Sequence, residues 1–144
     1  MCGIVGFCNC SEKVDKAILT SMRDALTHRG PDDAGIYVDE DNNVGLGHRR
    51  LSILDLSSLG HQPMSNENGS IWITYNGEVY NFKEIREELK QGGYNFKSNS
   101  DTEVVVKSYE EWGIDCVHKF IGMFALGIWD KIEKNYIWLG TELE

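Results

Sequence analysis

The second residue of the chain is a cysteine, which lies in the opening stretch MCGIVGF. Because the side chain of Cys2 is small, Met1 can be removed, which would leave a thiol and a free α-amino group on one residue. An ordinary thiol, with a pKa of about 8.5, is mostly protonated at neutral pH, whereas an α-amine with a pKa of about 7.7–8.0 can accept its proton. Cys2 is therefore either a nucleophile with its own base or a small buried residue at the start of a strand. Retention of Met1 would convert that amine into an amide and remove the base.

The pair Asn76–Gly77 in YNGEVYN is a second candidate for chemistry. Asn-Gly is typical of two-residue hairpin turns, but here a capped-helix pattern follows in place of an alternating return strand. A strand that ends at this pair would expose the Asn76 amide and the Gly77 N–H together. Two such donors can stabilise a developing oxyanion.

Charged residues at three further places could hold a substrate. Arg49 and Arg50 lie in GHRRLSI, and strand alternation places them on opposite faces, so at most one points into a given pocket. Either arginine is a solvated surface residue or a fork for a carboxylate, and periodicity does not choose between them. Asp101, in the first turn of a predicted helix, either stabilises the helix dipole or pairs with a ligand ammonium, and Glu78 has the same two interpretations.

A metal site can be assembled on paper from Cys8, Cys10, His28, His48 and His61. Their spacing matches neither C-x₂-C pairs nor H-x₃₋₅-H, and we expect no metal.

Composition limits the class of protein. The chain has 144 residues and a net charge of −9, which is typical of one globular domain and argues against a nucleic-acid binder. No apolar run approaches the roughly 20 residues that a transmembrane helix needs, so no membrane partner is expected. Four cysteines without an export signal predict reduced thiols in the cytoplasm.

Periodicity predicts an α+β layered fold with little regular βαβ alternation. Strands are expected over 3–7, 35–38, 43–54 and 70–77, and a hairpin over 122–130 and 135–140 with KIEK as its turn. A helix is expected over 11–28, with Ser11 as N-cap and HRGP as its end. Two more are expected over 81–93, with Asn81 and Glu84 in capping-box spacing and Gly92 at the end, and over 100–113, with Ser100 and Glu103 in the same spacing and Gly113 as its end.

Six blocks, in order from Met1 to about Leu139, resemble the glutaminase domain of asparagine synthetase, a class II glutamine amidotransferase. They are MCGIVGF, HRGPDDAG, GHRRLSILDLSSLGHQPM, ITYNGEVYN, SDTEV and FIGMFALGIWD. The resemblance implies an N-terminal nucleophile hydrolase fold with four αββα layers and two stacked antiparallel sheets. It also implies that residues 1–144 form this amidotransferase type 2 domain, truncated at its C-terminus and without the synthetase domain.

The resemblance implies a role for each candidate. Cys2 is the nucleophile, Arg50 rather than Arg49 binds the glutamine carboxylate, and Asp101 holds the α-ammonium. The oxyanion hole is assigned to Asn76 and Gly77, and the remaining glutamine-recognition residues are Leu51, Ser52, Ile53, Leu54 and Glu78.

The reaction implied is hydrolysis of L-glutamine through a glutamyl thioester, with the ammonia passed to a synthetase domain of the same parent chain that amidates aspartate. ATP and Mg²⁺ are expected only in that domain, and no cofactor in this one. A different acceptor, such as a sugar acid in surface-polysaccharide synthesis, stays open, as does a glutamine-binding fragment without activity. The unpaired sheet edge left by truncation could also pair with a second copy in a homodimer.

Overall fold

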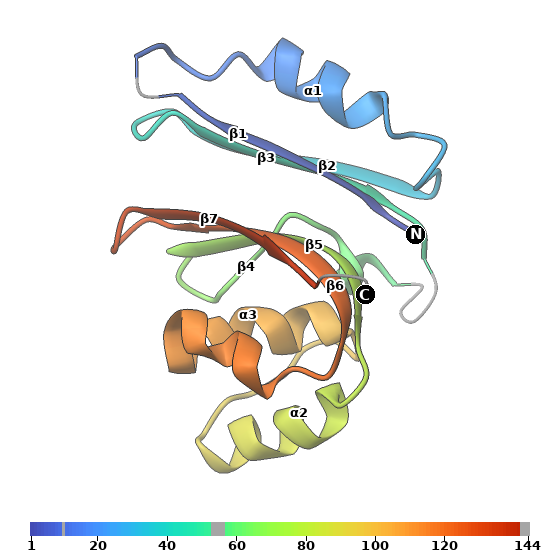
Figure 1. The fold of residues 1–144 in the computed structure, drawn as a ribbon, viewed down its shortest axis with the longest axis vertical. Coiled ribbons are helices and arrows are strands. Elements are labelled where there is room, and N and C mark those ends of the chain that lie inside the picture. The colour runs from blue at the N-terminus through green and yellow to red at the C-terminus, as the bar shows by residue number, and fades with distance from the viewer. Residues whose placement is uncertain (10, 53–56, 142–144) are drawn as a thin grey trace.

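The computed structural model describes residues 1–9, 11–52 and 57–141. Helix α1 (Lys16–Asp24) covers a sheet of β1 (Gly3–Cys8), β3 (Val44–Arg50) and β2 (Asp33–Asp39), in that order. A second sheet, in the order β4 (Met64–Ser65), β5 (Ile71–Val79), β6 (Gly122–Asp130) and β7 (Asn135–Gly140), lies against the first (Figure 1). Helix α3 (Asp101–Trp112) packs on its outer face, and α2 (Phe82–Gln91) packs on α3. All strand pairs are antiparallel, so the predicted αββα layering is confirmed.

The space between the sheets is filled by residues that alternate along the strands. Val44 and Leu46 of β3 are fully buried and pack with Trp129 of β6. Tyr37 of β2 stacks on Trp72 of β5, with ring centroids 3.9 Å apart. Because side chains alternate along β3, the even-numbered residues of this strand, which end with His48 and Arg50, face the second sheet.

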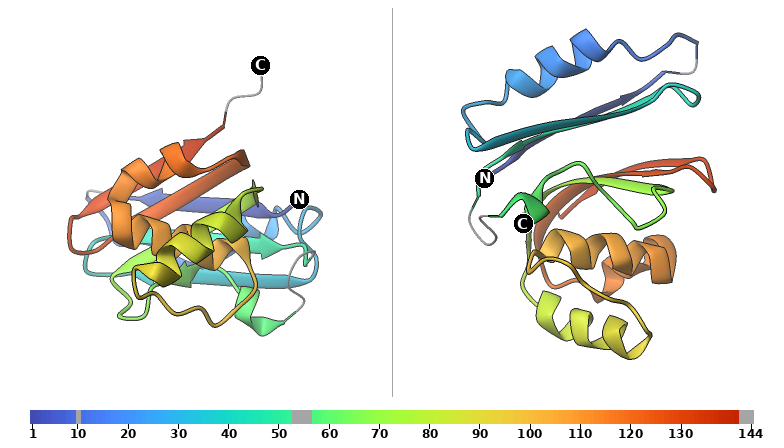
Figure 2. Two further views of the ribbon diagram at one scale, coloured as in Figure 1. Left: turned by 90° about the horizontal axis from the view of Figure 1, so that it is seen from below. Right: turned by 180° about the vertical axis from the view of Figure 1, so that it is seen from behind.

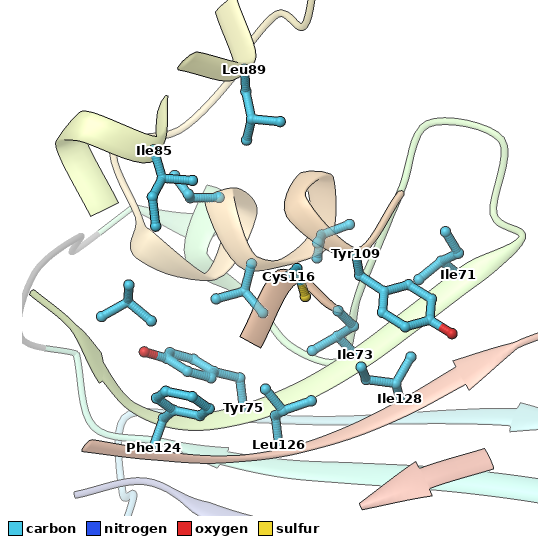
Figure 3. Packing of buried hydrophobic residues seen from close by; sticks show 14 residues of the cluster. Ile71, Ile73, Tyr75, Ile85, Leu89, Tyr109, Cys116, Phe124, Leu126 and Ile128 are labelled. Atoms are coloured by element: carbon cyan, nitrogen blue, oxygen red, sulfur yellow. The ribbon is translucent and has the colours of Figure 1, made fainter. Parts of the chain in front are cut away.

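The larger core lies between the second sheet and the helices (Figure 3). Ile71, Ile73 and Tyr75 of β5 point into it from one strand, as period-2 alternation requires. Ile85 and Leu89 of α2 close it from the far side. Helix α3 lies between these two groups and is buried from Asp101 to Tyr109.

Helix α1 is shorter than the predicted span 11–28. Asp15, not Ser11, is the N-cap, and its carboxylate accepts hydrogen bonds from Ala17 N at 2.7 Å and Ile18 N at 3.4 Å. Ala25 is the C-cap, and residues 25–29 form turns before Gly30 is reached. The carboxylate of Asp15 satisfies two free N–H groups at the start of the helix, which is why the helix begins after this residue.

Of the other predicted N-terminal caps, the one of α3 forms and the one of α2 does not. Ser100 caps α3 by accepting a hydrogen bond from Glu103 N at 3.3 Å, and Gly113 ends the helix with a φ of 59°, as predicted. Asn81 precedes α2, but the predicted capping box is absent, because its side chain makes no cap bond. It bonds instead to Lys119 O and Ile121 N, and so joins α2 to the start of β6.

Strand β5 continues through Asn76–Gly77 to Val79, in register with β6. The pair is therefore neither a hairpin turn nor the end of the strand. Strand β3 ends at Arg50, earlier than the predicted span 43–54, and the last two residues of that span lie outside the described residues. The hairpin of β6 and β7 with its turn at 131–134 is confirmed.

The N-terminus lies at one end of the layered structure, next to the turn η1 (Ser58–Gly60) and the last residues of β5 (Figure 2). A second 3₁₀ segment, η2 (Gly113–Lys119), follows α3 at the other end of that helix. The first end contains the candidate site.

Candidate active site

A pocket of about 320 Å³ opens where β1 begins, β3 ends and α3 begins. Of the residues predicted to act on glutamine, seven line it: Cys2, Arg50, Leu51, Asn76, Gly77, Glu78 and Asp101. Residues from four separate stretches of the chain are thus gathered in one cavity, as the assigned roles require.

The Cys2 side chain is held at the mouth of this pocket by the end of β3. Its sulfur accepts a hydrogen bond from Leu51 N at 3.4 Å and lies 3.8 Å from Leu51 O. Arg29 Nε donates to Cys2 O at 3.1 Å, which fixes the backbone of the same residue. The pairing of Gly3 with Arg49 in the β1–β3 ladder sets this position. An N–H directed at the sulfur can stabilise negative charge on it.

The two arginines have different surroundings, as strand alternation predicts. Arg50 lines the pocket and is 8% exposed, and its Nη1 donates to Ser57 O at 2.8 Å. Gly60 packs directly on its guanidinium, since a Cβ at this position would lie 2.2 Å from Arg50 Nη2. Arg49 points to the other face, where its Nε donates to Gly30 O at 2.9 Å and its Nη1 lies 3.6 Å from Asp24. The structure thus places Arg50, and not Arg49, in the pocket.

The middle of the pocket wall is the segment Asn76–Glu78 of β5. Asn76 is half-buried, and Gly77 and Glu78 are exposed. Gly77 has a φ of 143°, and a Cβ there would lie 2.3 Å from Met123 O and 2.4 Å from Phe124 Cα of β6. Both the backbone conformation and the contact with β6 therefore require glycine.

Asp101 is the first residue of α3 and is 5% exposed. Its Oδ2 accepts hydrogen bonds from the Tyr75 hydroxyl at 2.7 Å and from Val79 N at 3.2 Å. Burial is the main reason that the pKa of Tyr75 is raised well above its ordinary value, and the charge of Asp101 adds to it. The hydroxyl is therefore a proton donor over the whole working range of pH.

Among the predicted glutamine-recognition residues that the structure describes, Ser52 is the one outside the pocket lining. The Ser52 side chain is not part of the lining, and Ser52 N donates to Asp32 Oδ2 at 2.8 Å. Ile53 and Leu54 lie outside the described residues. Their roles stay predictions.

The pocket also contains residues that sequence reasoning missed: Met1, Gly60, Gln62, Tyr75, Tyr80, Ser100, Thr102 and Met123. Gln62 joins β5 to α3, since its Oε1 accepts a hydrogen bond from Tyr75 N at 2.7 Å and its Nε2 donates to Thr102 Oγ1 at 3.4 Å. Tyr75 directly precedes the candidate Asn76 in the same strand, and this is the signal by which it could have been found.

His48 supports the pocket from the interior between the sheets. Its Nε2 lies 3.0 Å from Tyr75 O, and because a carbonyl only accepts, Nε2 carries the proton. Nδ1 is then unprotonated, and it is buried without a partner among the described residues. Burial lowers the pKa of His48 to about 4, although the hydrogen bond to Tyr75 O acts in the opposite direction. His48 is thus neutral at physiological pH.

Asp33 and His61 form a side-chain hydrogen bond, with the carboxylate oxygen 2.6 Å from Nδ1. Burial raises the pKa of Asp33, but the hydrogen bonds from His61 and from Ala34 N outweigh burial, so the pKa is lower than usual. The pair joins His61, which directly follows η1, to β2.

The predicted absence of a metal was judged from spacing alone. Within residues 1–9, 11–52 and 57–141, no group of three or more His, Cys, Asp or Glu side chains could hold a metal ion, and Cys10 is outside these ranges. Over the same ranges, no helix is both long and apolar enough to span a membrane.

Comparison with known proteins adds to this geometry. Over 143 residues the chain is 47% identical to asparagine synthetase [glutamine-hydrolyzing] 2 of Bacillus subtilis. The alignment covers 96% of this chain and 18% of that protein. It is 44% identical over 135 residues to asparagine synthetase [glutamine-hydrolyzing] 1 of the same organism, in an alignment that covers 91% of this chain and 21% of that protein. The chain therefore spans about a fifth of the length of these relatives.

A solved structure has the same fold at low sequence identity. It is the glutamine phosphoribosylpyrophosphate amidotransferase of B. subtilis, which superimposes with a TM-score of 0.70 at 21% identity and covers 89% of this chain and 35% of that one. The glutamine amidotransferase domain family matches residues 1–139, which contain the whole of the pocket. The chain therefore belongs to the glutamine amidotransferase domain family.

Proposed function

We propose that the domain hydrolyses L-glutamine to glutamate and ammonia, with Cys2 as the nucleophile. The observation that carries the proposal is that one pocket contains the Cys2 thiol, the Arg50 guanidinium and the Asp101 carboxylate. Glutamine carries a carboxylate and an ammonium at one end and an amide at the other. Arg50 and Asp101 bind the charged end, and the side-chain amide then reaches the sulfur, so that catalysis depends on positioning.

The chemical steps require Met1 to be removed, because its peptide bond otherwise occupies the Cys2 nitrogen. The free α-amine takes the thiol proton, and the thiolate attacks the amide carbon. Asn76 and the Gly77 N–H stabilise the oxyanion of the tetrahedral intermediate. Its collapse breaks the C–N bond, the α-ammonium returns the proton to the leaving ammonia, and water then hydrolyses the thioester to glutamate and the free thiol.

The ammonia acceptor belongs to the same proposal. The names of the similar B. subtilis proteins favour aspartate, amidated to asparagine by an ATP- and Mg²⁺-dependent synthetase domain of the parent protein. No residue of the present chain is assigned to that step.

Ammonia release tests the proposal directly. A chain whose N-terminus is Cys2 is expected to release one ammonia for each glutamate formed, and Cys2→Ala is expected to lower the rate at least about 10³-fold. Cys8→Ser is the matched control, since Cys8 is an exposed cysteine that does not line the pocket. Equal activity of wild type and Cys2→Ala would contradict the proposal.

A further inference from the structure

The side chain of Asp101 is buried at the start of α3. Among the described residues, no lysine, arginine or histidine forms an ion pair with it. Only Oδ2 has hydrogen-bond donors in this part of the chain, the Tyr75 hydroxyl and Val79 N. A buried carboxylate needs compensation from hydrogen bonds or a counter-ion, and a cationic ligand group in the pocket would supply the second.

The backbone of Tyr75 is held by two side chains, and its side chain is packed in the core. Its backbone N–H donates to Gln62 Oε1 at 2.7 Å, and its carbonyl is 3.0 Å from His48 Nε2. These side chains substitute for a neighbouring strand, because β4 pairs with β5 only at Ile73 and Trp72. The ring itself is 2% exposed and lies in the helix-side core, beside Phe124 (Figure 3).

We propose that Tyr75 is a positioning residue, whose hydroxyl holds Oδ2 of Asp101 and leaves Oδ1 to bind the α-ammonium of glutamine. The proposal rests on the glutamine hydrolysis proposed above and extends it to a residue outside the predicted site. A carboxylate rotates readily about its last side-chain bond, because the torsion angle of that bond has a broad, roughly two-fold distribution. The two hydrogen-bond donors on Oδ2 therefore restrict the rotation of the carboxylate. Val79 N alone, at 3.2 Å, is the longer of the two contacts.

Tyr75→Phe removes only the hydroxyl and keeps the ring in the core. Because the α-ammonium lies far from the reacting amide, the variant is expected to raise the KM for glutamine about 10-fold and keep kcat within about 3-fold. The matched control is Tyr109→Phe. The Tyr109 side chain is 5% exposed in the same core and its hydroxyl bonds to Asp130, but it does not line the pocket.

The decisive readout is selectivity for the α-ammonium, measured as the ratio of kcat/KM for glutamine to that for 4-carbamoylbutanoate, which is glutamine without its α-amino group. Tyr75→Phe is expected to lower this ratio about 10-fold, and Tyr109→Phe to leave it unchanged. A variant that only loosened the fold would slow both substrates equally. An unchanged ratio in Tyr75→Phe, or an equal loss with both substrates, would overturn the proposal.

A second variant tests the route through Asp101. Asp101→Asn is expected to lower the ratio, and adding Tyr75→Phe to it is expected to lower the ratio no further, because the two residues act as one unit. A further loss in the double variant would show that Tyr75 acts elsewhere. Failure of glutamine hydrolysis itself is recognised separately, since the wild-type chain with Cys2 at its N-terminus would then release no ammonia.

Discussion

The backbone nitrogen of Leu51 lies 3.4 Å from the sulfur of Cys2, although 49 positions separate the two residues. The antiparallel register of β1 with β3 produces this contact, because Gly3 is paired with Arg49 and the chain leaves β3 at the next residue. The same register places Arg50 in the cavity beside the thiol. The positions of Cys2 and Arg50, the proposed nucleophile and the proposed carboxylate-binding residue, are thus set by one strand pair.

The two neighbouring arginines allow a matched test of substrate binding. Arg50→Gln is expected to raise the KM for glutamine about 100-fold, because it removes a charged fork from a buried position. Arg49→Gln is expected to change the KM less than about 3-fold and to cost about 1 kcal/mol of stability, through the lost hydrogen bond to Gly30 O. Steady-state kinetics and urea unfolding of both variants check this. Equal KM values would show that Arg50 does not bind substrate.

Gly60→Ala tests whether the guanidinium position matters and not only its charge. The new Cβ would lie 2.2 Å from Arg50 Nη2 and would displace it, so the KM for glutamine is expected to rise about 10-fold with little change in stability. Gly92→Ala is the control, since the new Cβ would lie 3.3 Å from Leu89 O and the φ of −77° at this position suits alanine. A KM that stays at the wild-type value in Gly60→Ala would mean that Arg50 adapts without loss.

Asn76→Ala is expected to act on kcat. If the Asn76 amide donates to the oxyanion, its removal should lower kcat about 10²–10³-fold with a small effect on KM. Glu78→Gln, at an exposed position of the same strand, is expected to act mainly on KM. Single-turnover and steady-state rates of the two variants distinguish these effects, and a loss confined to KM in Asn76→Ala would exclude an oxyanion role.

His48 makes stability depend on pH. The unfolded chain takes up a proton at His48 near pH 6.5, whereas the folded protein does so only near its pKa of about 4. Proton uptake thus favours unfolding in this window, so the stability contribution is complete above about pH 6.5 and is lost as the pH falls towards 4, by about 3 kcal/mol in total. Urea unfolding at several pH values measures the slope.

Two variants separate the contribution of His48 to the pH dependence of stability from that of the carboxylates that titrate in the same pH range. His48→Gln keeps an N–H donor near Tyr75 O and cannot titrate, so its stability is expected to fall less steeply below pH 6.5 than that of the wild type. His28→Gln, at an exposed position, is expected to keep the wild-type slope. Identical slopes for wild type and His48→Gln would contradict a buried neutral His48.

Local patterns predicted the features that depend on neighbouring residues. Alternation separated Arg49 from Arg50, and the Ser100–Glu103 spacing located the start of α3. They failed where a tertiary contact competes, as at Asn81, whose side chain bonds to the start of β6 and not to its own helix. The predicted N-cap at Ser11 was likewise wrong, because the carboxylate of Asp15 caps the helix, four residues before the buried Leu19.

The residues that hold the candidate site residues in place were harder to predict from the sequence. The bond between Tyr75 and Asp101 joins residues 26 positions apart, and the contacts of Gln62 depend on how the loop before β4 folds. No spacing rule relates these residues, because their proximity arises from the packing of α3 on β5. The family resemblance supplied roles for Cys2, Arg50 and Asp101, and the structure supplied the residues that hold them.

In the proposed reaction Cys2, once freed of Met1, is the nucleophile. The most direct measurement is intact mass spectrometry with peptide mapping after incubation with a diazo-ketone analogue of glutamine, an electrophile that alkylates the attacking thiol. We expect a chain that lacks Met1 and carries a single adduct on Cys2, with the other three cysteines unmodified and with protection by excess glutamine. A chain that lacks Met1 and carries no adduct on Cys2 would contradict it.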